Sequence, residues 1–208
     1  MDGDAAPQRR ILEGSGEAPA VAALLAMLGE RARDRVAHAL ATAEWTNRLT
    51  RALGWSVDRR EFTRLCALLH DVGLVGVPDR LLQSGAALSG DERTFVQGHC
   101  AAGERVVRSI AGLRSCAVVV RAHHERFDGS GYPDGLAGRE IPAEARLIGV
   151  ASSFQAMIED RPYRRALPAR EALAVLAQGR ARQWDPEAVD RMFELFPGRL
   201  KPLSRLAS

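Results

Sequence analysis

The chain has 208 residues, of which 46% are hydrophobic and 26% charged, the composition of an ordinary globular domain. The formal net charge of +3, with no block of like charge, argues against a DNA-binding protein. The longest apolar stretch, residues 19–28, is about half of the ~20 residues that a membrane span needs. The first ten residues, MDGDAAPQRR, do not have the charged-then-apolar order of a secretory signal, and Cys66, Cys100 and Cys116 are unevenly spaced in apolar helical surroundings. We therefore expect a cytoplasmic protein with reduced cysteines that serve packing.

The first half of the chain predicts helices that follow a short unstructured segment. Residues 1–18 show no periodicity and are expected to be flexible, followed by one folded domain over 19–197 and a tail over 198–208. Apolar residues recur at helical spacing over 20–53 and again over 58–70. Gly73, Gly76 and Pro78 then interrupt the pattern.

The second half of the chain adds further helices and one unusual loop. Ser89 and Glu92 have the order of a capping box and begin a helix that carries His99. A helix over 114–125 leads into a loop rich in glycine and proline, residues 128–142, and more helices are predicted over 143–159, 168–179 and 185–196. Alternating strand patterns are nearly absent. The sequence therefore predicts an all-α fold, with at most a short hairpin within 129–141.

The side chains best suited to chemistry are the five histidines: His38, His70, His99, His123 and His124. His70 and Asp71 adjoin at the end of an apolar helix, where an imidazole and a carboxylate can reach one metal ion. His123 and His124 form a second adjacent pair, just before the glycine-rich loop. Neutral imidazoles with a bridging carboxylate suit iron, manganese, zinc or nickel better than calcium or magnesium. Any one of these histidines alone is more often a hydrogen-bonded core or surface residue.

Several longer motifs occur in a fixed order around these histidines. Residues 70–79 read HDVGLVGVPD, residues 123–133 read HHERFDGSGYP, residues 160–164 read DRPYR and residues 184–186 read WDP. In this order they resemble the HD-GYP family of HD metal-dependent phosphohydrolases, over about residues 34 to 196. The resemblance implies an HD-domain helical bundle with a glycine-rich GYP loop.

The resemblance also implies an activity and a set of metal ligands. The family hydrolyses cyclic di-GMP to pGpG or GMP with two or three divalent transition metals, most often iron or manganese. His70 and Asp71 match its name-giving catalytic pair, with Asp71 as the bridging ligand. The other matched ligand positions are those of His99, His123 and His124. We expect two metal ions here.

The first-helix ligand depends on the alignment. An alignment without insertions places His38 at the family's first-helix histidine, and Asp34 four residues earlier, where some members have a glutamate. Residues four apart share a helix face, so Asp34 and His38 could point at the same ions. A competing alignment anchors on residues 35–37 and leaves no ligand on this helix. We prefer the first alignment because it requires no insertion.

Three positions depart from the family pattern. Ser152 stands where the family has a metal-binding aspartate, and Gln155 where a second aspartate is expected. A serine hydroxyl is a poor ligand, although it can hold a water beside the substrate, so we expect the second metal to bind more weakly. Leu74 replaces a lysine that usually follows the His-Asp pair. That replacement removes a cation that could contact a phosphate.

Substrate and partner contacts are also implied by the resemblance. Tyr132 falls at the wall of the substrate site, and its loop offers a docking surface for a signalling protein. Arg161 and Arg164 match residues that grip the phosphates of the dinucleotide, where a guanidinium fits bidentately. Two other functions remain open. One is a catalytically inactive HD-GYP domain that acts as a cyclic di-GMP receptor or docking module, and the other is a phosphohydrolase with a different substrate.

Overall fold

The structure, a computed structural model, describes residues 18–31, 33–82, 87–160 and 165–196. Its helices are α2 (Ala18–Arg31), α3 (Arg33–Ala52), α4 (Val57–Leu69), α5 (Asp79–Leu82), α6 (Gly90–Gln97), α7 (His99–Ser109), α8 (Ala117–Ala122), α9 (Ala143–Ile158), α10 (Ala169–Gln178) and α11 (Pro186–Glu194). Short 3-10 turns are η1 (Val72–Gly76), η2 (Ala111–Cys116) and η3 (Gly138–Glu140). The described ranges contain no strand, so the predicted all-α fold is confirmed.

Only single bridges resemble sheet pairing in the described part of the chain, between Asp128 and Ala137 and between Arg180 and Trp184. The first is all that forms of the hairpin allowed for the glycine-rich loop. The flexible segment and the tail expected at the two ends lie almost wholly outside the described residues. None of the described helices combines the length and the apolar character that a membrane crossing requires.

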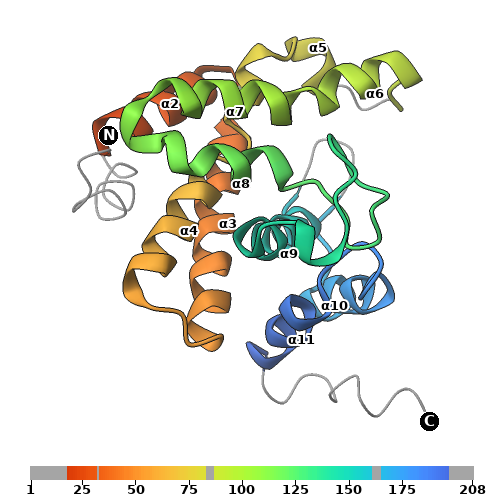
Figure 1. Cartoon of the computed structure of the whole chain (residues 1–208). Helices are drawn as coiled ribbons and strands as arrows, with labels where there is room; N and C mark the ends of the chain where they lie inside the picture. The colour runs from red at the N-terminus through yellow and green to blue at the C-terminus, as the bar shows by residue number, and fades with distance from the viewer. Residues whose placement is uncertain (1–17, 32, 83–86, 161–164, 197–208) are drawn as a thin grey trace, which may run out of the picture.

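Two of the helices expected from the sequence are divided in the structure. The stretch 20–53 forms α2 and α3, which run in different directions (Figure 1). The helix that begins at the capping box of Ser89 and Glu92 ends at Gly98, and α7 starts at His99. Apolar spacing continues across each division, so the pattern does not mark where one helix ends and the next begins. Hydrophobic periodicity reports burial and carries no signal for such a turn.

The helices enclose two main cores and one smaller cluster. Helices α2, α3, α4, α7 and α8 surround the first core, to which Leu69 and Val120 belong. Helices α9 and α11 pack against α3 around Phe154, α10 packs against α9 and α11, and together they form the second core. Figure 1 shows α2 and α7 crossing one end of the α3–α4 pair, with α10 and α11 on the other side of α9. Helix α3 thus connects the two cores and carries His38 between them.

The turn after α4 passes unusually close to α7. A Cβ atom at Gly73 would lie 2.0 Å from the carbonyl oxygen of His99 and 2.5 Å from the amide nitrogen of Gly103. Only glycine permits this approach, because a side chain there would overlap the backbone of α7. Gly73 therefore allows Asp71, two residues earlier, to lie beside His99.

Candidate metal centre

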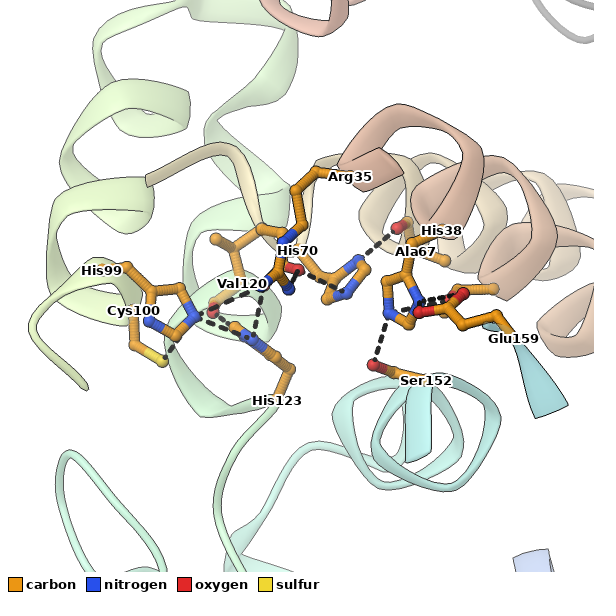
Figure 2. Close-up of polar contacts among 12 residues, drawn as sticks. Arg35, His38, Ala67, His70, His99, Cys100, Val120, His123, Ser152 and Glu159 are labelled. Carbon is orange, nitrogen blue, oxygen red and sulfur yellow. Dashed lines mark hydrogen bonds and ion pairs between the residues drawn. The ribbon is translucent and has the colours of Figure 1, made fainter. Parts of the chain in front are cut away.

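The five histidines and Asp71 converge from four parts of the chain. His38 comes from α3, His70 and Asp71 follow α4, His99 begins α7, and His123 and His124 follow α8. All but His124 are buried, and His124 is partly exposed. Their ligand atoms form two groups, each within 4.8 Å: His38, His70 and Asp71, and His99, Cys100, His123 and His124. Figure 2 shows the labelled histidines directed toward one another.

Asp71 lies between the two groups and faces both. Its Oδ1 is 3.4 Å from Nε2 of His99 and 3.7 Å from Nε2 of His123. Its Oδ2 is 3.5 Å from Nε2 of His70. Each carboxylate oxygen therefore serves a different set of imidazoles, which is the arrangement of a bridging ligand.

Backbone carbonyls fix the orientation of three of the imidazoles. In each case Nδ1 lies 2.6–2.7 Å from the carbonyl oxygen three residues earlier: Ala67 for His70, Val96 for His99 and Val120 for His123. The Nδ1–H group donates to the carbonyl, so Nε2 is directed into the site. Nε2 of His70 is buried without a hydrogen-bond partner. A buried nitrogen of this kind is costly to leave unpaired, and a metal ion would satisfy it.

Burial sets the protonation states of the cluster. Desolvation lowers the pKa of His70 to about 3, in spite of the neighbouring Asp71 carboxylate. It also lowers the pKa of His123, and that of His124 still further. Burial opposes the ionisation of Asp71, but the surrounding imidazoles outweigh it and hold the pKa of Asp71 well below its usual value. At neutral pH His70, His123 and His124 are therefore neutral imidazoles beside an ionised carboxylate, the forms that bind a metal.

His99 differs from the other histidines. Burial again favours its neutral form, but hydrogen bonds with Asp71 and Cys100 outweigh this effect and raise the pKa of His99 to about 10. His99 must give up its proton before it can act as a ligand. Imidazole nitrogens, a carboxylate and a thiol are donors that suit transition metals, and the residues present therefore fit such ions.

His38 is held by residues of α9 and its C-terminal end. Its Nδ1 lies 3.1 Å from both carboxylate oxygens of Glu159. Because a carboxylate only accepts, Nδ1 donates to Glu159. The other ring nitrogen, Nε2, lies 3.1 Å from Oγ of Ser152 (Figure 2) and 3.4 Å from Oγ1 of Thr42. Asp34, expected beside His38, is exposed in the first turn of α3 and belongs to neither group.

The two positions that lack a family carboxylate take part in this network. Ser152 contacts His38, and Gln155 donates from Nε2 to Glu159 over 3.1 Å. The Oε1 atom of Gln155 accepts from Nε1 of Trp45 over 3.1 Å. Sequence reasoning did not identify Glu159. The available signal was its position seven residues after Ser152, which is two helical turns and hence the same face.

The glycine-rich loop closes over His124. The ring of Tyr132 stacks on that of His124, with centroids 4.9 Å apart and an angle of 27°. Burial raises the pKa of Tyr132, so its phenol keeps the proton. The Glu125 carboxylate anchors the loop by accepting from the amides of Asp134 at 2.7 Å and Leu136 at 3.1 Å. Sequence reasoning also missed Glu125, although it directly follows the two histidines.

One cation near the centre, Arg35, was not identified from the sequence. Arg161 and Arg164 lie outside the described residues. Leu74 is buried in the small apolar cluster with Leu28, so the position expected for a lysine holds a packing residue. Arg35 instead places Nη1 3.8 Å from Oδ2 of Asp71. Its sequence signal was the spacing of three residues before His38, which places both on one face of α3.

The sequence matches the family described as HD domain over residues 19–188. It is 38% identical to the cyclic di-GMP phosphodiesterase response regulator RpfG of Xanthomonas campestris, over 67% of this chain and 38% of that protein. It is 36% identical to 3'3'-cGAMP-specific phosphodiesterase 3 of Vibrio cholerae, over 77% of this chain and 35% of that protein. A cyclic di-GMP phosphodiesterase of Thermotoga maritima is 36% identical, with coverages of 72% and 41%. The matched part of the chain thus spans about two fifths or less of the length of these relatives.

Two solved structures share the fold. An HDG"Y"P protein from Bdellovibrio bacteriovorus superposes with a TM-score of 0.66 at 21% identity, covering 78% of this chain and 52% of that one. A cyclic GMP-AMP-specific phosphodiesterase of V. cholerae gives a TM-score of 0.59 at 20% identity, with coverages of 82% and 46%. At these identities the similarity concerns the helical architecture, which agrees with the arrangement in Figure 1.

Proposed function

This chain belongs to the HD-GYP branch of the HD domain family, and we propose that it is a metal-dependent phosphodiesterase of cyclic dinucleotides. The position of Asp71 between two sets of imidazoles carries the proposal, because it suits a pair of metal ions. The proposed substrate is cyclic di-GMP, opened to pGpG or hydrolysed on to GMP. The relatives are named for cyclic di-GMP or for 3'3'-cGAMP, and both have the same cyclic phosphodiester chemistry.

Two divalent ions, iron or manganese, are assigned to the two groups. His38, His70 and Asp71 would hold one of them, and Asp71, His99, His123 and His124 would hold the other. Such ions supply Lewis acidity, which polarises a phosphodiester and lowers the pKa of a water. The site at His38 and His70 has the neutral Ser152 in place of a carboxylate, so it binds its ion more weakly than the other site does.

The protein's own groups bind and orient the substrate around this centre. Arg35 offers a guanidinium to the charge that develops on the phosphoryl oxygens, in a partly buried setting where such a contact is strong. The Tyr132 ring covers His124 and forms one wall of the site, and its protonated phenol can donate a hydrogen bond. The hydroxyl of Ser152, beside His38, holds a water or a substrate oxygen. Arg161 and Arg164 are proposed to contact the outer phosphates.

One observation favours a second candidate function. The position of the missing aspartate is filled by Ser152, whose hydroxyl contacts the nitrogen of His38 that would face the metal. A centre with one weakly held ion would bind a cyclic dinucleotide without cleaving it. The protein would then be a receptor, or a docking module that meets a signalling protein through the loop at Tyr132 and the neighbouring Pro133.

The proposed compartment is the cytoplasm. Supporting this, none of the three cysteines, all within the described residues, forms a disulfide. Thiols persist in compartments that are kept reducing.

Metal content and turnover of Asp71→Asn test the proposal. Protein produced with iron or manganese is analysed for bound metal and for release of pGpG and GMP from cyclic di-GMP. The wild type is expected to hold metal and to release product, whereas Asp71→Asn loses the bridge and both properties. Asp91→Asn, which changes an exposed carboxylate on α6, serves as the control and keeps both. Equal metal content and turnover in wild type and Asp71→Asn would overturn the assignment.

A further inference from the structure

A cysteine adjoins the second group of histidines. Cys100 follows His99 at the start of α7 and is fully buried. Its Sγ lies 3.6 Å from Nε2 of His99, and both atoms lie within 4.8 Å of the ligand atoms of His123 and His124. Figure 2 shows the sulfur beside the ring of His99, joined to it by a dashed line. From the sequence alone, Cys100 is expected to serve packing like the other two cysteines.

The separations among these atoms match those around a single ion. Nitrogen at ~2.0–2.1 Å and sulfur at ~2.3 Å from a tetrahedral metal lie about 3.3–3.6 Å from each other. Nε2 of His99 is 3.4 Å from Nε2 of His123 and 3.6 Å from Sγ of Cys100. Oδ1 of Asp71 lies 3.4 Å from the same nitrogen of His99. The thiol is therefore placed as closely as the imidazole and the carboxylate that the proposed centre already uses.

The other two cysteines have a different environment. Cys66 and Cys116 lie in the first core, among apolar side chains. Burial raises the pKa of the Cys66 thiol, and a hydrogen bond with Cys116 raises it further. These two thiols pack against each other inside the core, and they provide matched controls for Cys100.

We propose that Cys100 is a metal ligand, so that the ion among His99, His123 and Asp71 is bound through a mixed nitrogen, oxygen and sulfur set. On binding, the thiol gives its proton to solvent and the thiolate sulfur forms the bond to the metal. A soft thiolate favours zinc, cobalt or ferrous iron over manganese, so Cys100 biases the choice of metal at this position. The inference rests on the proposed function only for the presence of this metal centre.

Cobalt(II) is the probe that tests this inference. Metal-free, reduced full-length protein is titrated with cobalt(II) and followed by absorption, because a thiolate ligand gives a charge-transfer band in the near ultraviolet that nitrogen and oxygen ligands do not. The wild type is expected to show the band. Cys100→Ser is expected to lose it and to bind cobalt at least ~10-fold more weakly.

The double variant Cys66→Ala/Cys116→Ala keeps Cys100 and removes the other two thiols. It therefore tests whether the band comes from Cys100 even if Cys100→Ser does not fold. It leaves Cys100 as the one cysteine of the sequence, so a band that persists in it must come from Cys100. Cobalt binding without the band in the wild type, or a band that survives in folded Cys100→Ser, would overturn the inference.

Hydrolysis of cyclic di-GMP, measured on the same preparations, separates this inference from the proposed function. Turnover without the band would reject the thiol ligand alone, and the band without turnover would reject the phosphodiesterase alone. A wild type that binds no cobalt would contradict both.

Discussion

Nδ1 of His38 lies 3.1 Å from each carboxylate oxygen of Glu159, and Nε2 of the same ring is directed toward the cluster of histidines (Figure 2). A carboxylate that accepts from the far nitrogen of a histidine fixes its tautomer and orientation, and makes the other nitrogen a better ligand. Glu159 therefore acts as a positioning residue for His38. Ser152 supplies no carboxylate to the site, whereas Glu159 supplies one that acts through the imidazole of His38.

Glu159→Gln should lower the affinity for the ion assigned to His38 and His70 by roughly 10–100-fold, because an amide holds the imidazole of His38 less firmly than a carboxylate does. The ion assigned to His99 and His123 should keep its affinity. Calorimetric titration with manganese, which resolves the two sites, is the measurement. Glu61→Gln, at an exposed carboxylate on α4, is the control. Unchanged affinity at both sites in Glu159→Gln would show that the contact has no role in metal binding.

The metal-free protein should lose stability as the pH falls from 6.5 toward 5. The unfolded chain protonates its histidines near pH 6.5, whereas burial keeps His70 neutral down to a pKa of about 3. The unfolded state thus binds more protons, and as the pH falls His70 alone lowers the free energy of unfolding with a slope that approaches about 1.4 kcal/mol per pH unit near pH 5. His123 and His124, whose pKa values are also lowered, act in the same direction.

His99 does not reverse this trend. Its pKa of about 10 stabilises the folded state, and that contribution is already complete below the unfolded pKa and is lost only as the pH rises toward 10. Urea unfolding at pH 6.5, 5.75 and 5 measures the slope. A free energy of unfolding that stays constant over this range would mean that the imidazoles are not held neutral.

Gly131→Ala should displace the loop that carries Tyr132. A Cβ atom at this position would lie 2.2 Å from the amide nitrogen of Arg126 and 2.6 Å from Cα of Glu125, so the loop must move away. We expect a loss of about 1–3 kcal/mol in the free energy of unfolding and a higher KM for the cyclic dinucleotide. Gly90→Ala, where an added Cβ meets open space, is the control. A variant with native stability and KM would contradict this role of the loop.

Arg35→Gln should raise KM and lower kcat if its guanidinium contacts the phosphates beside Asp71. Arg35→Lys keeps the charge but lacks the planar fork, so it should recover only part of the activity. Steady-state kinetics of both variants at saturating metal provide the comparison. Equal kinetics in wild type and Arg35→Gln would remove Arg35 from the substrate site.

The parts of the site predicted from sequence are those whose signals are local. The His70–Asp71 pair precedes a glycine turn, and the capping box at Ser89 marks a helix start, so both can be identified from neighbouring residues. Glu159 and Arg35 act across the junction of α3, α4 and α9. Their spacing from Ser152 and His38 indicates a shared helix face, but it does not indicate which residues of the other helices they meet. The break at Gly98 is hidden in the sequence because helical periodicity continues across it.

We propose that this chain hydrolyses a cyclic dinucleotide at a centre of two metal ions that Asp71 would bridge, with Ser152 weakening the binding of one ion. Ser152→Asp adds a charged oxygen ligand beside His38 and should raise both the occupancy of the weaker ion and the rate of turnover. The direct measurement is the release of pGpG and GMP from cyclic di-GMP by wild-type and Ser152→Asp proteins, each loaded with iron or manganese. Both proteins should release product, and the variant should release more. If both proteins bind cyclic di-GMP yet release neither product, the chain is a receptor or docking domain and the claim of catalysis is wrong.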